Sequence, residues 1–250
     1  MDQHRDELGN TPLHLALEQE NEEWIESLLR SGADPNLANA EGSTALRIIC
    51  KRDSDDDFLE TFFEIVDDVQ QIDARDESGN APLHLATESG NANSIESLLR
   101  KGADPNLANA EGSTALRIVC MDDDADDLAE MLFEISGEKN QPLRLDAEDN
   151  LERTPLQWAA ASLNPSVIDL LLDYGADLES FVFPDRDYFG KGFDPRNEYS
   201  GNFKLILASG ALAVVERLEN RGYELDQSSR FDDHEILRRP RIVRKIDAPS

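Results

Sequence analysis

The amino-acid sequence repeats itself along its length. Residues 11–50 and 81–120, aligned with a shift of 70, carry the same amino acid at 31 of 40 positions. A shorter period lies inside each block, because the motif TPLH at 11–14 returns 33 residues later as TALR at 44–47. A unit of this length cannot bury its own apolar face, so a core forms only when copies stack on their neighbours. The sequence therefore predicts a stacked array of short units.

Each unit has the hydrophobic pattern of two helices. Ile25, Leu28 and Leu29 are spaced i, i+3 and i+4, which is the spacing of one buried helical stripe, and the other units repeat it. A glycine, suited to the left-handed end of a helix, follows the second helix in three units: Gly32, Gly102 and Gly175. The turn residues that come next, such as those at 39–43, predict a projecting hairpin finger.

These motifs resemble those of the ankyrin-repeat family, whose 33-residue units carry T-P-L-H-x-A followed by G-A-D-x-N. The sequence has TPLHLA at 11–16, APLHLA at 81–86, and GAD at 32–34, 102–104 and 175–177. The resemblance implies an all-α solenoid of stacked helix-turn-helix units with short β-hairpin fingers. Five recognisable repeats would start near residues 6, 39, 76, 109 and 149, and a degraded sixth near 197. Residues 1–226 would form the repeat domain, with an aromatic insert at 181–199, followed by a basic C-terminal tail at 227–250.

The charge balance excludes several classes of function. The chain has 24 Lys and Arg against 53 Asp and Glu, a formal net charge of −29. Nucleic-acid binding draws on a basic surface, and an anionic membrane repels this much negative charge, so we expect neither partner. No apolar run approaches the ~18 residues of a membrane span, and the N-terminus lacks the apolar stretch of a signal peptide. With two cysteines only, the chain fits a reducing compartment, either cytoplasmic or nuclear.

The histidines and cysteines are interpreted as structural. His14 and His84 share their position in the repeat with arginine or glutamine in other copies, a substitution that a catalytic group would not tolerate. The resemblance implies that this histidine forms a hydrogen bond within the turn that starts the first helix. Cys50 and Cys120 lie two repeats apart, and we expect both to be buried free thiols.

Two acidic runs, at 53–57 and 122–127, fail as calcium loops. The first places Phe58 where such a loop needs glycine, and the second places Phe133 at the last ligand position. We interpret both runs as the charged starts of second helices. No motif of a known catalytic class is present, so we expect no enzyme activity, no metal and no cofactor.

The fingers are the candidate binding site. The resemblance implies that finger tips and the adjoining first helices form a concave face that binds protein partners. The expected contacts are Glu7, Leu8 and Asn10 in the first finger, Ala40, Glu41 and Ser43 in the second, Glu77, Ser78 and Asn80 in the third, Ala110, Glu111 and Ser113 in the fourth, and Asn150, Leu151 and Arg153 in the fifth.

The sequence thus predicts a non-catalytic, monomeric interaction module, namely an adaptor, scaffold or inhibitor whose charge favours a partner with a basic segment. The alternative is a segment of a longer array with a structural or spacer role and no dedicated ligand. The aromatic insert is open to two interpretations, as an interface anchor or as a cover for the core. A basic tract in the tail fits either a nuclear-localisation segment or a solvated tail: Arg238, Arg239, Arg241, Arg244 and Lys245.

Overall fold

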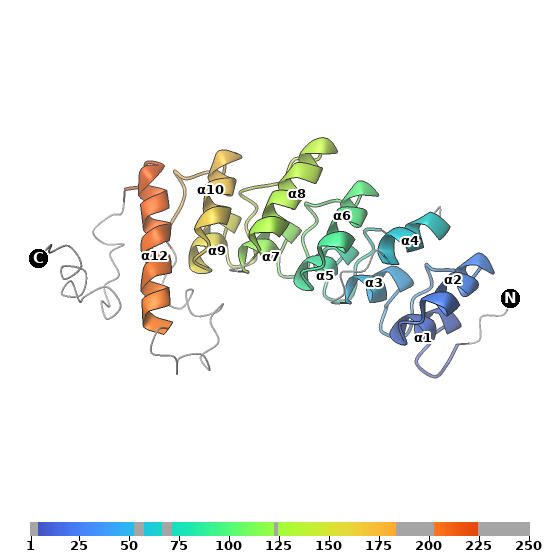
Figure 1. The fold of residues 1–250 in the computed structure, drawn as a ribbon. Coiled ribbons are helices and arrows are strands. Elements are labelled where there is room, and N and C mark those ends of the chain that lie inside the picture. Colours follow the sequence, from blue (N-terminus) through green and yellow to red (C-terminus); the bar gives the residue numbers. More distant parts are fainter. Residues whose placement is uncertain (1–4, 53–57, 67–71, 123–124, 184–202, 225–250) are drawn as a thin grey trace, which may run out of the picture.

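The chain forms a row of helix pairs, which confirms the predicted solenoid (Figure 1). The computed structural model describes residues 5–52, 58–66, 72–122, 125–183 and 203–224, with side chains in the last range from residue 209. The first helices of the five repeats lie along one side of the row: α1 (Pro12–Glu18), α3 (Ala45–Cys50), α5 (Pro82–Glu88), α7 (Ala115–Cys120) and α9 (Pro155–Ala161). The second helices lie along the other side: α2 (Glu22–Arg30), α4 (Phe58–Ile65), α6 (Ala92–Arg100), α8 (Asp126–Glu138) and α10 (Pro165–Asp173).

Local sequence explains where these helices begin and end. A proline occupies the first turn of α1, α5, α9 and α10, where its missing N–H costs nothing. An asparagine caps three of the second helices by accepting a backbone hydrogen bond from the third residue after it: Asn21, Asn91 and Asn164. As predicted, a glycine with positive φ follows α2, α6 and α10: Gly32, Gly102 and Gly175.

The core runs through the whole stack without interruption. Each first helix packs on the first helices beside it, and α2, α4, α6, α8 and α10 pack in the same order. The predicted stripe is buried, with Ile25, Ile95 and Ile168 fully inaccessible to solvent. Stability therefore comes from contacts between neighbouring repeats, as expected for a solenoid.

The fingers differ from the β-hairpins that the resemblance implied. In the described residues they are tight turns without paired strands, because each arm is too short for a ladder of hydrogen bonds. Neighbouring fingers are joined by single backbone bonds, such as the one from the Ala110 N–H to the Ser78 carbonyl (2.9 Å). Gly79 permits this approach, since a Cβ at that position would lie 2.7 Å from the Ala110 nitrogen.

The degraded sixth unit does not form a helix pair. Residues Phe203–Asn220 form one continuous helix, α12, which packs on α10 at the end of the row (Figure 1). At the position of the capping asparagines this unit has Ala211, which cannot accept the bond that starts a separate second helix. The C-terminal half of α12 still behaves as a second helix: Leu218 is buried and Gly222 follows with a φ of 97°.

The duplicated repeats supply a matched test of this packing. Leu98 on α6 is fully buried between repeats, whereas its equivalent on α2, Leu28, is half-exposed. We expect Leu98→Ala to lower the free energy of unfolding by about 3 kcal/mol and Leu28→Ala by roughly half of that, because less apolar surface is lost from a half-exposed site. Urea titrations followed by circular dichroism measure both. Equal losses would contradict the packing described above.

Candidate functional site

Each finger is closed by its first residue, here called the finger-entry residue: Asp6, Asn39, Asp76, Asn109 and Asp149. Its side-chain oxygen accepts backbone hydrogen bonds from the residues two and four positions further on. Asp6 Oδ1, for example, accepts from the N–H groups of Leu8 (2.9 Å) and Asn10 (2.8 Å). Asn39 accepts the same two bonds in the second finger. Aspartate and asparagine therefore serve equally well, and the turn itself needs no charge.

A buried side chain connects each of the first four repeats to the next finger. We call it the linking residue: His14, Arg47, His84 and Arg117. Gln157 holds the same position in the fifth repeat, where it is half-buried and donates to the Val182 carbonyl (3.1 Å). His14 Nδ1 accepts the Thr11 backbone N–H (3.2 Å), so the ring proton lies on Nε2, which donates to the Ser43 carbonyl (2.9 Å). The local bond expected of this histidine is confirmed. The second bond, to a finger 29 residues away, was not predicted and makes the histidine a connector between repeats.

His84 repeats this arrangement on the fourth finger. Its Nε2 donates to the Ser113 carbonyl (2.9 Å), and burial lowers the pKa of the ring, which keeps the imidazole neutral near pH 7. In both histidine boundaries the finger-entry residue is asparagine, whose amide donates to the last residue of the previous finger. The bonds run from Asn39 Nδ2 to Asn10 Oδ1 and from Asn109 Nδ2 to Asn80 Oδ1, each 2.8 Å long.

The arginine boundaries use a charged version of the same connection. Arg47 Nη2 donates to the Asn80 carbonyl (3.1 Å) and lies 3.7 Å from the Asp76 carboxylate. Arg117 Nε donates to Asp149 Oδ2 (3.1 Å). Because a buried guanidinium needs a nearby negative charge, aspartate follows arginine where asparagine follows histidine. The finger-entry residue thus matches the linking residue of the preceding repeat.

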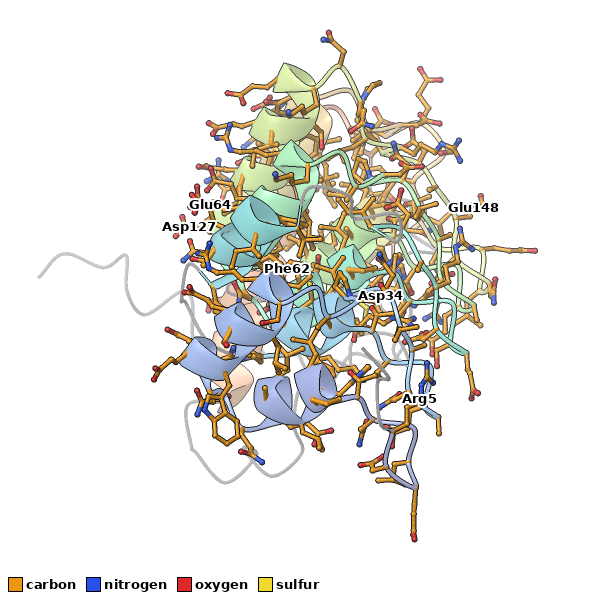
Figure 2. The ribbon with its side chains drawn as sticks, turned by 90° about the vertical axis from the view of Figure 1, so that its right-hand side faces the viewer. Arg5, Asp34, Phe62, Glu64, Asp127 and Glu148 are labelled. Carbon is orange, nitrogen blue, oxygen red and sulfur yellow. The ribbon has the colours of Figure 1, made fainter. Side chains whose placement is uncertain are left out.

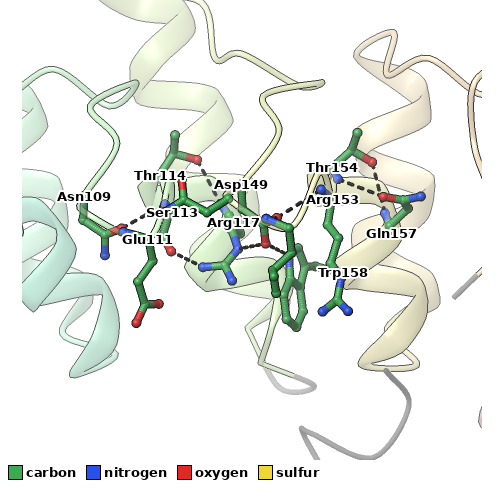
Figure 3. Close-up of polar contacts among 12 residues, drawn as sticks. Asn109, Glu111, Ser113, Thr114, Arg117, Asp149, Arg153, Thr154, Gln157 and Trp158 are labelled. Carbon is green, nitrogen blue, oxygen red and sulfur yellow. Dashed lines mark hydrogen bonds and ion pairs between the residues drawn. The ribbon is translucent and has the colours of Figure 1, made fainter. Parts of the chain in front are cut away.

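Figure 3 shows the arginine boundary between the fourth and fifth repeats. Trp158 Nε1 donates to the same Asp149 Oδ2 that Arg117 contacts (3.0 Å). The guanidinium of Arg117 lies 4.5 Å from the centre of the Trp158 ring, and that of Arg153 lies 5.4 Å from it. Cation–π contact and shared hydrogen bonding therefore hold this boundary together. Trp158 occupies a position at which the other first helices carry leucine or isoleucine. This difference was the one sequence signal for the Arg117–Asp149–Trp158 contacts.

The predicted finger contacts divide into an exposed and a covered group. Exposed residues are those at the second and third finger positions: Glu7, Leu8, Ala40, Glu41, Glu77, Ser78, Ala110, Glu111, Asn150 and Leu151. The last finger position is covered, with Asn10, Ser43 and Ser113 buried and Asn80 and Arg153 half-buried. That position takes part in stacking, so within each finger the tip is the part available to a partner.

Acidic groups gather around the end of α5, on the side of the stack that carries the fingers. Partial burial raises the pKa of Glu88, and the charges of Asp76 and Glu111 raise it further, opposed by Lys51. The three carboxylates come from one first helix and two fingers, which the fold brings together, and Lys51 directly follows α3. Figure 2 shows that Glu148 lies on the finger side, opposite Glu64 of α4 and Asp127 of α8. The exposed finger tips and the exposed ends of the first helices are called the finger face below.

The structure describes only parts of the aromatic insert and of the two acidic runs, and none of the basic tract. Phe181 and Phe183, at the start of the aromatic insert, are buried, and Phe181 packs edge-to-face on Tyr223 (5.2 Å between ring centres). These two rings cover the core, while the rest of the insert and the basic tract at 238–245 lie outside the described residues. Asp126 and Asp127 begin α8 as expected, but residues 53–57 also lie outside the described ranges.

The described ranges contain neither a candidate metal site nor a candidate membrane span. Among these residues no three His, Cys, Asp or Glu side chains are grouped as a metal site requires. None of the helices there has the length and apolar character needed to cross a bilayer.

The architecture is that of a helix-turn-helix solenoid with projecting turns. The family model "Ankyrin repeats (3 copies)" matches this chain twice, over residues 13–109 and 90–181. The chain therefore belongs to the ankyrin-repeat family. Ankyrin repeats are generally protein–protein interaction modules, and the family is typically non-catalytic.

Several relatives match over much of the chain. Human transient receptor potential cation channel subfamily A member 1 is 27% identical over 236 residues, which cover 92% of this chain and 21% of that protein. The nuclear factor NF-kappa-B p105 subunit of Gallus gallus is 25% identical over 254 residues, 94% of this chain and 25% of the relative. Neurogenic locus notch homolog protein 1 of Danio rerio is 31% identical over 153 residues, 60% of this chain and 6% of the relative. The chain thus spans a quarter or less of the length of these relatives.

The pairing of linking and finger-entry residues can be tested by a double-mutant cycle. Arg117→His should lower the free energy of unfolding by about 3 kcal/mol, because it leaves the Asp149 carboxylate buried without its arginine. Adding Asp149→Asn recreates the histidine–asparagine pair of the other boundaries, so the double variant should lose less than the sum of the single variants. Urea unfolding measures all four chains. Strict additivity would show that the two positions are not coupled.

The thiols yield a second prediction. Cys50 and Cys120 are fully buried and free, and burial raises the pKa of both thiols above its ordinary value. Since the thiolate is the reactive form, neither should react with a disulfide reagent such as DTNB in the native chain, and both should react in urea. Rapid native labelling would contradict their burial.

Proposed function

We propose that the chain is a non-catalytic adaptor, scaffold or inhibitor that binds a protein partner through its finger face, and that the partner contributes a basic segment. The observation that carries this proposal is the group formed by Glu88, Asp76 and Glu111. Partial burial chiefly raises the pKa of Glu88, and the charges of Asp76 and Glu111 raise it further, so a cation that binds beside Glu88 stabilises its ionised form as well as forming new contacts. The net charge of −29 adds long-range attraction, within a Debye length of ~8 Å at physiological salt.

The side chains at the exposed finger tips are the other groups that a partner on the finger face would contact. Glu41 and Glu111 occupy the third position of the second and fourth fingers, whereas Leu8 and Leu151 occupy it in the first and fifth. The third finger position is therefore acidic in the second and fourth fingers and apolar in the first and fifth, while Glu7 and Glu152 keep acidic groups at both ends of the face. A basic segment with an apolar residue toward each end fits this order.

We further propose that the chain acts as a monomer in the cytoplasm or nucleus, without nucleic acid, membrane or cofactor as a partner. The two free thiols support a reducing compartment. The tract formed by Arg238, Arg239, Arg241, Arg244 and Lys245 is proposed as a nuclear-localisation segment. Truncation after Asp226 in cells tests that role, because nuclear signal should fall when the tract is lost.

The binding experiment uses a fluorescent eight-residue Lys/Arg peptide as the probe. Glu88→Gln with Glu111→Gln should weaken binding about threefold to tenfold, since each exposed charge pair contributes roughly 0.2–1 kcal/mol. Glu60→Gln with Glu64→Gln on α4 changes the net charge equally and should leave affinity within a factor of about two. If both double variants weaken binding alike, the peptide responds to overall charge and the finger face is not its site.

The free energy of unfolding and the pH dependence of peptide affinity together show whether Glu88 binds the peptide or stabilises the fold. The pKa of Glu88 is raised in the folded chain, so its ionised form is disfavoured there, and Glu88→Gln should not lower the free energy of unfolding at pH 7. Peptide affinity should weaken as the pH falls through this raised pKa, because protonation removes the charge that the peptide contacts. Fluorescence anisotropy at several pH values and at two salt concentrations measures the affinity. Binding that is independent of salt would overturn the electrostatic proposal.

A further inference from the structure

The first and third repeats are nearly identical in sequence but differ in burial. Leu85 on α5 is 5% exposed, whereas its equivalent Leu15 on α1 is 38% exposed. Three further pairs of identical residues, Pro12/Pro82, Leu28/Leu98 and Ala33/Ala103, show the same difference. By contrast, Leu13 and Leu83 are buried alike. Both repeats are followed by a similar repeat, so the difference arises from what precedes them: α3 and α4 pack on the third repeat.

The exposed side of the first repeat is called the end face: Pro12, Leu15, Asn21, Trp24, Leu28 and Ala33. Figure 2 looks along the row onto this end, with α1 and α2 in front. Trp24 is 58% exposed, while Ser94, its counterpart on α6, is 2% exposed. Apolar residues of this kind are covered elsewhere in the stack, so the end face has the surface of an interior repeat boundary.

Polar groups on this face also match those of an occupied boundary. Asn91 Nδ2 donates to the Arg52 carbonyl at the end of the preceding first helix (3.3 Å), and Asn164 Nδ2 reaches the Asp122 carbonyl in the same way (3.5 Å). Asn21 holds the equivalent amide. The end face therefore presents the Asn21 amide as a hydrogen-bond donor at the position where interior boundaries use Asn91 and Asn164. A partner that fits this face must supply the carbonyl acceptor.

The finger-entry residue identifies the kind of repeat that fits. At the four boundaries between the first five repeats, aspartate stands at this position only where the preceding repeat links through arginine, as at Arg47–Asp76 and Arg117–Asp149. Asp6 is the finger-entry residue of the first repeat, and no arginine pairs with it among the described residues. Hydrogen bonding, chiefly from the Asn10 backbone N–H, lowers the pKa of Asp6, so its carboxylate is charged at neutral pH.

We propose that the end face binds one further ankyrin-type helix pair, with arginine as its linking residue, which stacks on α1 and α2 as α3 and α4 stack on α5 and α6. The arginine pairs with Asp6, the end of its first helix accepts from Asn21, and its apolar side covers Leu15, Trp24 and Leu28. A second copy that met this face through its own end face would bring Asn21 and Asp6 but no linking arginine, because Arg47 and Arg117 lie at interior boundaries. This inference does not depend on the finger-face proposal.

The experiment places a copy of residues 39–75 directly before Asp6 in the full chain, which reproduces the natural join between Arg75 and Asp76. Docking should shift the Trp24 emission to shorter wavelength, reduce its quenching by acrylamide severalfold and raise the urea midpoint. Trp158 is already buried and should contribute little to the change. A glycine-serine segment of the same length should leave Trp24 as quenchable as before. Arg47→Ala, made only in the added copy, should reverse part of the gain.

Three outcomes would overturn the proposal. The first is an added repeat that leaves Trp24 as quenchable as in the unmodified chain. The second is a rise in the urea midpoint only when Trp24→Ser is combined with the added repeat, which would show that the indole closes the face to repeats. The third comes from sedimentation of the unmodified chain: a dimer that Trp24→Ser dissociates would make a second copy the occupant.

Discussion

The bond from each linking residue to the next finger holds this structure in register. Apolar stripes alone let stacked helices slide, because dispersion and hydrophobic contacts have little directional preference. A buried donor left without its acceptor costs about 1–3 kcal/mol, so His14 and Arg117 accept only the alignment that places a finger opposite them. The projection of the second to fifth fingers, and with it most of the proposed binding surface, depends on this contact.

Two versions of the contact alternate along the chain. Histidine with asparagine joins the first repeat to the second and the third to the fourth, while arginine with aspartate joins the second to the third and the fourth to the fifth. The natural building block is therefore a pair of repeats, in agreement with the internal duplication at a shift of 70 residues. Exchanging one member of a pair alone leaves either a buried charge without a counter-charge or a donor without an acceptor.

Much of this was predictable from sequence, and the failures have physical causes. The repeat period located the helix pairs, because stacking requires the same apolar stripe in every copy, and the slot shared by His14 and Arg47 indicated a structural role. Contacts between repeats could not be read from periodicity, so the burial of Ser43 and the Arg117–Asp149–Trp158 group were missed. In the sixth unit the apolar pattern survived, but the loss of a capping residue at Ala211 merged two expected helices into one.

The residues that stack the repeats and the residues proposed to bind a partner are largely separate sets. Finger-entry, last-finger and linking positions are committed to stacking, which leaves the second and third finger positions free to vary without loss of stability. The two proposed surfaces nevertheless meet at the first finger. Neighbouring fingers are joined by backbone bonds such as Ala40 N–H to the Leu8 carbonyl (2.9 Å). A repeat that docks on the end face would bring its own finger against Asp6 in the same manner. It would turn the apolar tip of Leu8 from the end of the finger face into an interior position and so lengthen the surface that a partner meets.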